Sequence, residues 1–403
     1  MALMPVAEAL ARVLEHAHPL MPQPVKLQDA HRRVLAENLA ARRTQPPEDV
    51  SAMDGYAARA ADVANVPATL KVIGEVAAGR PFAGEVTPGC AARIFTGGVV
   101  PKGADTIVVQ ENVRRDGDTI TVEVTAPLNK HIRRAGLDFR KGQVLLKTGR
   151  LLSGRDLSLA ASMNYDMLSV LRSPRVAVLA TGDELVMPGT EPGPGQIVYS
   201  NGYAVMALAR GEGAQVTDLG LVPDRVEETV VAIRRARAAQ ADVLVTTGGA
   251  SVGDYDLVQK ALASEGLDIS FWKVALRPGR PLMHGRLGAM HVLGLPGNPV
   301  SAFVCAVLFL SPLLRKLSGR SDIGPVTESA CAGIDLPEND ERADYMRATL
   351  ALGPDGEWVA TPFQTQDSSM MQALAAADCL LVREPFAPPL RAGEPCGIVK
   401  LPL

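Results

Sequence analysis

Residues 242–256 read DVLVTTGGASVGDYD, and they say more about function than any other stretch of the chain. Its apolar run, Val243 to Val245, has the length and β-branching of a buried strand. A glycine-rich polar loop follows, and its candidate ligand-binding residues are Gly248, Gly249, Ser251 and Gly253. Glycines there let backbone N–H groups close on an anion, and the helix expected next would point its positive end at the same place. The stretch therefore predicts a phosphate cradle, although an ordinary strand-to-helix turn is the simpler alternative.

The residues around this stretch alternate between strand and helix patterns from Pro174 onward. The expected strands are Arg175–Ala180, Gln215–Leu221, Asp242–Thr246, Phe271–Leu276 and Met290–Leu293. The expected helices are Ser200–Arg210, Arg225–Gln240, Asp256–Glu265 and Pro299–Leu314. Such alternation predicts a doubly wound parallel sheet covered on both faces, with its ligand site at the carboxyl ends of the strands.

Polar residues follow several of these strands. The acids are Glu184, Asp224 and Asp256, and we expect a Mg²⁺-like ion among them. A proline loop opens the last helix, and its candidate binding residues are Pro296, Asn298, Pro299 and Ser301. Together these residues predict an elongated phosphate-bearing ligand and phosphoryl or nucleotidyl chemistry, which works by positioning and charge neutralisation.

Lys273 lies on the expected strand Phe271–Leu276, and Arg277 would continue it by one residue. Because strand side chains alternate, both would share one face, about 13 Å apart. A pair spaced in this way can hold two anionic groups of one ligand. The alternative is a pair of surface charges on an edge strand.

The remaining segments differ in the spacing of their apolar residues and in their content of Gly and Pro, and these differences divide the chain into domains. Residues 5–18 predict an amphipathic helix, and a second short helix is expected over residues 28–38. Four domains are expected. They are an elongated helical domain (1–45 and 140–172), an inserted β-rich domain (46–139), the doubly wound domain (173–322) and a C-terminal β-barrel domain (323–403).

Composition narrows the class of protein. The net charge is −3 and aromatic residues make up 4%, so neither nucleic-acid binding nor a base-stacking surface is expected. The five cysteines are scattered without a CxxC pair, which predicts reduced thiols. The N-terminus lacks the apolar core of a signal peptide, and the apolar run Val300–Leu310 is too short to span a bilayer. We expect a cytoplasmic protein that does not bind a membrane.

Six strings taken together resemble the family of molybdopterin molybdenumtransferases, the bacterial counterparts of the gephyrin E domain. They are SAMDGYA (51–57), IFTGGVVPKGADTIV (94–108), TGDEL (181–185), TTGGASVGDYD (246–256), FWKVALRPGRP (271–281) and GLPGNPVS (294–301). The resemblance implies insertion of molybdate into adenylylated molybdopterin, with Mg²⁺-dependent release of AMP. It also implies an elongated homodimer whose active cleft is shared between subunits. Contact with the adenylylating enzyme that precedes it in the pathway is a further possibility.

The resemblance also assigns residues by motif position. Its functional polar residues correspond to Asp54, Thr96, Asp138, Glu184, Asp224 and Asp256. Lys273 and Arg277 match two basic positions, with arginine at 277 where lysine is common. The segment Gln364–Met371 matches the family's serine-bearing segment only loosely. The resemblance places a molybdate pocket at Arg347 and Ser368 on this loose match.

Two other functions remain open from the sequence. A nucleotide or pterin phosphohydrolase could use the same cradle and acids without an oxyanion substrate. A gephyrin-like scaffold would bind ligand or partner without turnover. Turnover that requires molybdate distinguishes the transferase from both.

Overall fold

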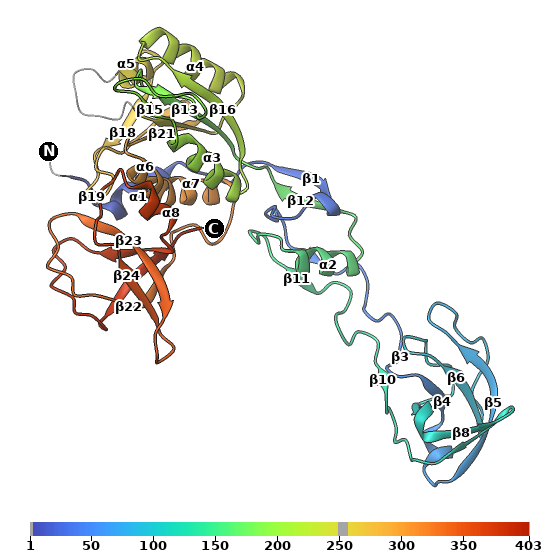
Figure 1. The fold of residues 1–403 in the computed structure, drawn as a ribbon. Helices are drawn as coiled ribbons and strands as arrows, with labels where there is room; N and C mark the ends of the chain where they lie inside the picture. Colours follow the sequence, from blue (N-terminus) through green and yellow to red (C-terminus); the bar gives the residue numbers. More distant parts are fainter. Residues whose placement is uncertain (1–2, 249–256, 403) are drawn as a thin grey trace.

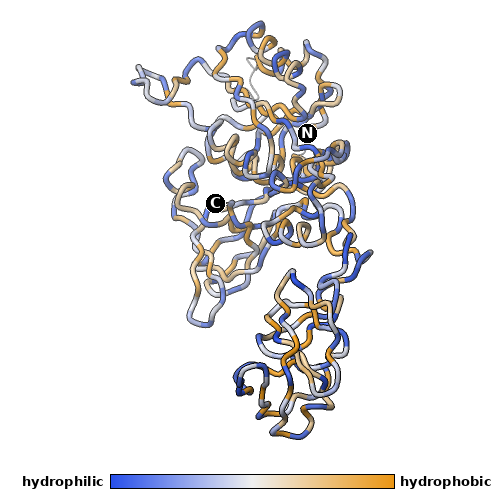
Figure 2. Tube along the Cα trace, turned by 90° about the vertical axis from the view of Figure 1, so that its right-hand side faces the viewer, coloured by the Kyte–Doolittle hydropathy of each residue, from blue (hydrophilic) through white to orange (hydrophobic). Residues whose placement is uncertain are grey.

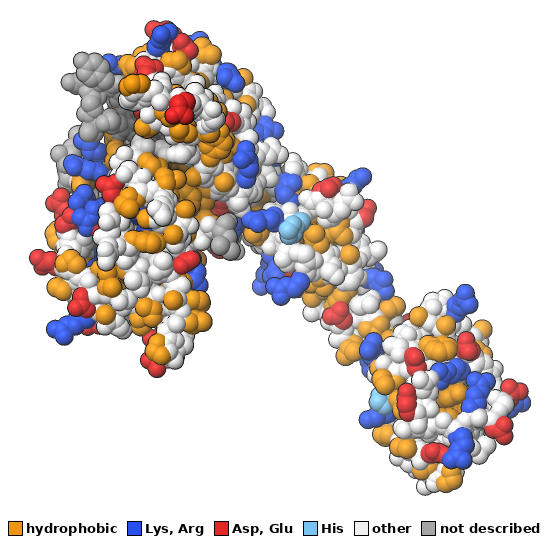
Figure 3. All heavy atoms as spheres, viewed as in Figure 1, with side chains coloured by type: hydrophobic (Ala, Val, Ile, Leu, Met, Phe, Trp, Pro, Cys, Tyr) orange, Lys and Arg blue, Asp and Glu red, His pale blue; other side chains and the backbone are white. Residues whose placement is uncertain are grey.

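The computed structural model describes residues 3–248 and 257–402, and it is elongated. A large two-domain lobe and a small β-rich domain lie at opposite ends, joined by a narrow middle region (Figure 1). The space-filling view shows the same narrowing, with Lys and Arg side chains on the surface of the middle region (Figure 3). The chain passes out along this region and returns along it, so the β-rich domain is an insertion.

The doubly wound domain is built on a six-stranded sheet in the order β16-β13-β17-β21-β20-β18. Its strands are β13 (Arg175–Thr181), β16 (Gln215–Val222), β17 (Val243–Thr247), β18 (Asp268–Trp272), β20 (Met283–Leu287) and β21 (Met290–Leu295). The four strands β16, β13, β17 and β21 are parallel, whereas β20 and β18 add antiparallel to one edge. The parallel sheet is therefore confirmed for its central strands. Strand β20 was not predicted, and β18 begins earlier in the chain than the expected strand Phe271–Leu276.

Helices cover both faces of this sheet. They are α3 (Asn201–Gly211), α4 (Val226–Ala238), α5 (Leu257–Ser264), α6 (Pro299–Cys305) and α7 (Ser311–Leu317). Val178 and Val245 face a core shared with α3, α6 and α7, whereas Ala177 and Leu244 face α4 and α5. Successive strand residues thus supply opposite cores, which is why these strands read as continuous apolar runs. Hydrophobic segments accordingly run through the interior of the large lobe (Figure 2).

One continuous helical stretch runs from α6 through a π-helical turn (Ala306–Leu310) to α7. The stretch Pro299–Leu317 is long and apolar enough to cross a membrane, but 83% of its apolar window is buried inside the protein. It packs against α1 (Val6–Glu15), whose Ala9 and Val13 are fully buried in the same core. This stretch is therefore the central core helix of the doubly wound domain, and it extends beyond the apolar run Val300–Leu310 that the sequence indicates.

The middle region contains one α-helix, α2 (Gly154–Ser162), with a capping box between Ser153 and Asp156. Its other elements are β1 (Pro22–Lys26), β2 (Leu39–Ala40), β11 (Val144–Leu146), β12 (Met167–Leu171) and a 3₁₀ turn, Leu27–Asp29. Strand β1 pairs with β12, and β2 pairs with β11. The prediction of a short helix over residues 28–38 is wrong. Arg32 has a positive φ of 59°, and Val34 and Leu35 form β-bridges to Leu151 and Val170.

The β-rich domain folds around a six-stranded sheet in the order β7-β4-β6-β5-β9-β8. These strands are β4 (Gly55–Ala58), β5 (Ala68–Val76), β6 (Cys90–Ile94), β7 (Thr106–Val109), β8 (Val113–Asp116) and β9 (Thr119–Val122). Two 3₁₀ turns lie at Ala60–Val63 and Gln110–Asn112. A short pair, β3 (Val50–Ser51) with β10 (Ile132–Arg133), joins the domain to the middle region.

The C-terminal domain is a closed barrel. Its strands are β22 (Thr327–Ala332), β23 (Ala343–Leu352), β24 (Trp358–Pro362), β25 (Cys379–Arg383) and β26 (Pro395–Lys400). The pairing of β23 with both β24 and β25 closes the sheet, as the barrel prediction requires. A short strand, β19 (Leu276–Arg277), and a short helix, α8 (Met371–Ala375), connect the barrel to the doubly wound domain.

Candidate functional site

A pocket of about 310 Å³ lies at the carboxyl ends of β13 and β17. The ends of these strands supply Thr181, Thr247 and Gly248 to its wall. The short parallel pair β14 (Leu185–Val186) and β15 (Ile197–Val198) forms another wall. This is the edge of the sheet where strand topology places a ligand.

Gly248 ends the strand in a conformation that only glycine adopts easily. Its φ is 89°, and a Cβ there would lie 2.5 Å from the carbonyl oxygen of Thr181. The Thr181 hydroxyl lines the pocket and the Thr246 hydroxyl is buried near the end of β17, and within residues 3–248 and 257–402 neither has a hydrogen-bond partner. The strand ends thus carry hydroxyl groups that a bound ligand could pair. The other predicted cradle residues, Gly249, Ser251 and Gly253, lie outside the described residues, as does Asp256.

Two of the predicted acids lie on neighbouring loops after the parallel strands. Glu184 lines the pocket, and its carboxylate lies against Gly182, where a Cβ would be 2.6 Å from Oε2. The backbone N–H of Asp224 donates to Oδ1 of Asp183 at 3.1 Å. Burial raises the pKa of the Asp224 carboxyl, and the negative charges of Asp183 and Glu184 raise it further. This region therefore carries negative charge that a cation would offset.

These acids do not by themselves complete a metal site. Within residues 3–248 and 257–402, no three Asp, Glu, His or Cys side chains gather closely enough to hold a metal ion. A cation held here would take further oxygen ligands from the substrate, from water or from the undescribed Asp256.

The proline loop between β21 and α6 forms the third wall of the pocket. Asn298 and Pro299 line it, and Nδ2 of Asn201 donates to the carbonyl of Gly297 at 2.6 Å. Pro299 is the first residue of α6, a position where proline costs no helical hydrogen bond. The two other predicted loop residues, Pro296 and Ser301, are buried beneath this wall.

A segment of the C-terminal domain also reaches the pocket. Nδ2 of Asn298 donates to Oγ of Ser368 at 2.8 Å, and the N–H of Val300 donates to the Ser368 carbonyl at 3.1 Å. The next residue, Ser369, lines the pocket and donates through its hydroxyl to Oδ1 of Asp367 at 2.5 Å. The pocket is therefore built by two domains.

Arg347 lies inside the barrel, with 0% of its surface exposed. Its Nη1 donates to the Met370 carbonyl at 3.4 Å, whereas Nε and Nη2 have no hydrogen-bond partner in the part of the chain that the structure describes. Burial lowers the pKa of this guanidinium, and the charges of Asp367 and Asp344 act in the opposite direction. Among the described contacts, no hydrogen bond joins Arg347 to Ser368, the residue that the sequence analysis paired with it.

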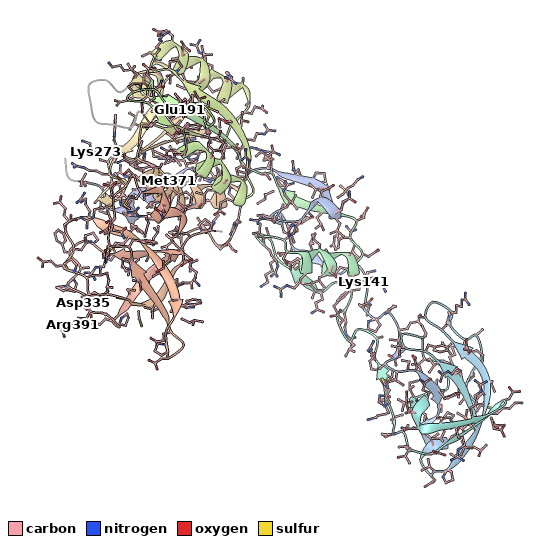
Figure 4. All side chains as sticks on the ribbon, in the orientation of Figure 1. Lys141, Glu191, Lys273, Asp335, Met371 and Arg391 are labelled. Atoms are coloured by element: carbon pink, nitrogen blue, oxygen red, sulfur yellow. The ribbon has the colours of Figure 1, made fainter. Side chains whose placement is uncertain are left out.

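The expectation that Lys273 and Arg277 share one strand face is wrong. Lys273 follows the end of β18 and has a positive φ of 80°, so the chain turns there. Figure 4 labels it beside the junction of the two large domains. Arg277 belongs to β19 and forms ion pairs with Asp344 at 2.7 Å and Asp340 at 3.1 Å. Its charge is thus already paired within the barrel domain.

Asp54 and Thr96 lie together in the β-rich domain. Oδ1 of Asp54 accepts hydrogen bonds from the backbone N–H of Thr96 at 2.7 Å and from its hydroxyl at 2.8 Å. These two bonds, with the charge of Arg93, hold the pKa of Asp54 below its usual range. Asp54 is therefore an oriented, ionised carboxylate.

Within one chain these two residues lie far from the strand-end pocket, because the β-rich domain is at the opposite end of the molecule (Figure 1). Asp138 is exposed on the returning connection between them, and its N–H donates to the Gln45 carbonyl at 3.0 Å. The predicted residues therefore form two separate groups in a single chain.

Several residues that line the pocket were not among the predicted site residues. They are Thr181, Tyr199, Asn201, Thr247 and Ser369. Thr181 and Thr247 end strands that were predicted, so their place after an apolar run was an available signal. Nothing in the sequence indicates that Ser369, from another domain, would reach this pocket.

Three protein-family models match the chain in order. They describe the MoeA N-terminal region (domain I and II) over residues 4–164, a probable molybdopterin binding domain over 177–316, and the MoeA C-terminal region (domain IV) over 329–401. The chain is 36% identical over 391 residues to the molybdopterin molybdenumtransferase of Haemophilus influenzae, covering 96% of both chains. It is 32% identical over 386 residues to that of Bacillus subtilis, covering 94% of this chain and 89% of the relative.

A solved structure has the same architecture. The molybdopterin biosynthesis MoeA protein of Pyrococcus horikoshii OT3 superposes with a TM-score of 0.84 at 28% identity, covering 99% of this chain and 100% of that one. Sequence, domain order and fold thus agree over nearly the whole length. The chain belongs to the molybdopterin molybdenumtransferase family, whose members are transferases of molybdenum cofactor biosynthesis.

Proposed function

We propose that this protein inserts molybdate into adenylylated molybdopterin and releases AMP in a Mg²⁺-dependent reaction. The observation that carries the proposal is the strand-end pocket. It combines a glycine turn at Gly248, the carboxylate of Glu184 and the unpaired hydroxyl of Thr181. Hydroxyl donors beside acids suit a phosphate-bearing ligand that arrives with a divalent cation.

The residues of the pocket would hold the ligand in place. Gly248 allows the backbone to approach it closely, and the proline loop is fixed from both sides by Asn201 and Ser368. Bound Mg²⁺ would supply charge neutralisation at the phosphate. Glu184 and Asp224 would hold it together with Asp256, and the raised pKa of Asp224 supports a local need for positive charge.

Arg347 is the residue best suited to bind molybdate as substrate. Two of its nitrogens, Nε and Nη2, have no acceptor among the described residues, and an oxyanion would supply one. Because Arg347 is fully buried, the segment Asp367–Met370 must move before an oxyanion can reach it. That segment also borders the strand-end pocket through Ser369, so both substrates would meet at one junction.

We further propose a homodimer in which the β-rich domain of one subunit completes the pocket of the other. Asp54 is oriented by Thr96, yet it lies in the β-rich domain, at the opposite end of the molecule from the strand-end pocket (Figure 1). A second subunit would bring this carboxylate to a strand-end pocket. A cytoplasmic location is supported by the five cysteines, all of which are free thiols.

The test is AMP release from adenylylated molybdopterin with Mg²⁺, measured with and without molybdate. We expect release only when molybdate is present. Release at the same rate without molybdate would favour a phosphohydrolase. Tight ligand binding without release under either condition would favour a scaffold role.

A further inference from the structure

Arg93 lies beside the Asp54–Gly55 segment of the β-rich domain, and its charge acts on the Asp54 carboxylate. It is on β6, opposite Tyr56 of β4. Its guanidinium carbon lies 5.1 Å from the centre of the Tyr56 ring and 4.9 Å from the centre of the Phe95 ring. Two aromatic faces therefore hold the guanidinium in one place.

One hydrogen bond of Arg93 reaches the backbone next to Asp54, and the other reaches the side chain of Gln110. Nη1 donates to the Gly55 carbonyl at 3.3 Å, and Nη2 donates to Oε1 of Gln110 at 2.6 Å. The N–H of Gln110 in turn donates to the Asp54 carbonyl at 3.1 Å. Both acceptors of Arg93 are neutral oxygens, so its positive charge remains available to act on the Asp54 carboxylate.

We propose that Arg93 is a positioning residue for Asp54: its fork fixes the Asp54–Gly55 backbone while Thr96 fixes the side chain. Close packing supports this reading, because a Cβ at Gly55 would lie 2.0 Å from the Val108 carbonyl oxygen. The chain at Asp54 is thus held by three neighbouring segments. This inference rests on the proposed function, in which Asp54 of one subunit acts at the pocket of another.

Other charged groups lie on the elements packed around Asp54. Glu75 of β5 pairs in register with Arg93, and Glu111 accepts a hydrogen bond from Gln110 at 3.3 Å. On the other side, the His131 carbonyl accepts from the N–H of Ala52 at 2.8 Å. Among these charged groups, Arg93 is the one whose charge lowers the pKa of Asp54, in addition to the two hydrogen bonds from Thr96.

The experiment compares R93Q and R93K with the wild-type protein, using R114Q as the matched control. Arg114 lies in the same domain in an exposed ion pair with Glu123, away from Asp54. Two quantities are measured. One is the titration of the Asp54 carboxyl by carbon NMR in protein labelled at aspartate, with the signal assigned from D54N. The other is molybdate-dependent AMP release.

We expect R93Q to raise the pKa of Asp54 and to slow AMP release roughly tenfold. R93K keeps the charge, so it should leave the titration near wild type and give an intermediate rate. R114Q should change neither quantity. An unchanged Asp54 titration in folded R93Q would overturn the proposal. If R93Q does not fold, R93K decides: an intermediate rate supports the role of the fork, and a wild-type rate overturns it.

The two measurements separate this inference from the proposed function. If the wild-type protein releases no AMP, the proposed function fails, while the carboxyl titration still tests whether Arg93 acts on Asp54.

Discussion

Gly248 is a position after β17 that only glycine can occupy without strain. An alanine there would have both an unfavourable positive φ and a Cβ 2.5 Å from the Thr181 carbonyl oxygen. We expect G248A to lower the free energy of unfolding by about 1–3 kcal/mol and to weaken ligand binding. The control is G189A, where φ is 91° but nothing lies within 4 Å of the new Cβ. Denaturant unfolding measures both, and equal losses would mean that the contact with Thr181 does not matter.

A second prediction at this scale concerns the acids. E184Q removes a charge that lines the pocket, so AMP release should fall by roughly a hundredfold while the fold is retained. The control is E191Q, because Glu191 is exposed on the loop between β14 and β15 and does not line the pocket (Figure 4). Single-turnover assays of the two variants give the comparison. Wild-type release in E184Q would remove this acid from the mechanism.

Some site residues could be predicted from sequence and others could not. Glu184 and Gly248 lie on the loops that follow apolar strands, so strand topology brings them to one edge. The prediction that Lys273 lies on a continuous strand was wrong, because its apolar neighbours give no sign of the positive φ that turns the chain there. Ser369 depends on how two domains dock, and a local pattern does not contain that information.

At the scale of elements, β20 and β21 bury a histidine pair. His284 and His291 have their ring nitrogens 3.3 Å apart and are almost fully buried. Burial lowers the pKa of His284 to about 3 and that of His291 to about 4. Both are therefore neutral in the folded protein, whereas in the unfolded chain they take up protons near pH 6.5.

Stability should therefore fall as the pH drops. The contribution of the pair is complete above pH 6.5 and is lost as the pH falls from 6.5 toward 4 and then 3, because the unfolded chain binds more protons. Between pH 6.5 and 5 the loss should be roughly 2 kcal/mol for each histidine. Unfolding followed by Trp272 fluorescence in a W358F background measures it. Replacing both histidines with leucine should remove this component, whereas H18Q, at an exposed position, should not.

Most elements could be predicted because their patterns are local. The strands β13, β16 and β17 and the helices α3 and α4 lie within a residue or two of their expected bounds. The antiparallel edge could not be predicted, because β20 contains His284 and Arg286 and does not read as a buried strand. The run Phe271–Leu276 was read as one strand, yet its two ends pair in different sheets.

For the whole molecule, a shared pocket predicts complementation between two inactive subunits. In a heterodimer of D54A and E184A chains, one site carries both changes and the other carries neither. Activity should therefore return to about half the wild-type value per dimer, although each homodimer is inactive. Co-expression with two different tags and sequential purification give the heterodimer. No recovery in verified heterodimers would mean that each site is built within a single chain.

At this scale the sequence predicts an inserted β-rich domain, because the β-rich character starts and stops along the chain. The distance between Asp54 and Glu184 within one chain was not readable. It depends on the direction in which the middle region projects from the large lobe, and no motif records that direction (Figure 1).

The two connections to the β-rich domain run side by side in opposite directions. They pair through β2 with β11, a bridge between Gln45 and Phe139, and β3 with β10. A single flexible tether would let the domain spin about its own axis, whereas a paired ribbon resists torsion and bends mainly across its flat face. The β-rich domain should therefore rotate about one hinge axis and not in all directions. It would present the same surface to the large lobe throughout this motion.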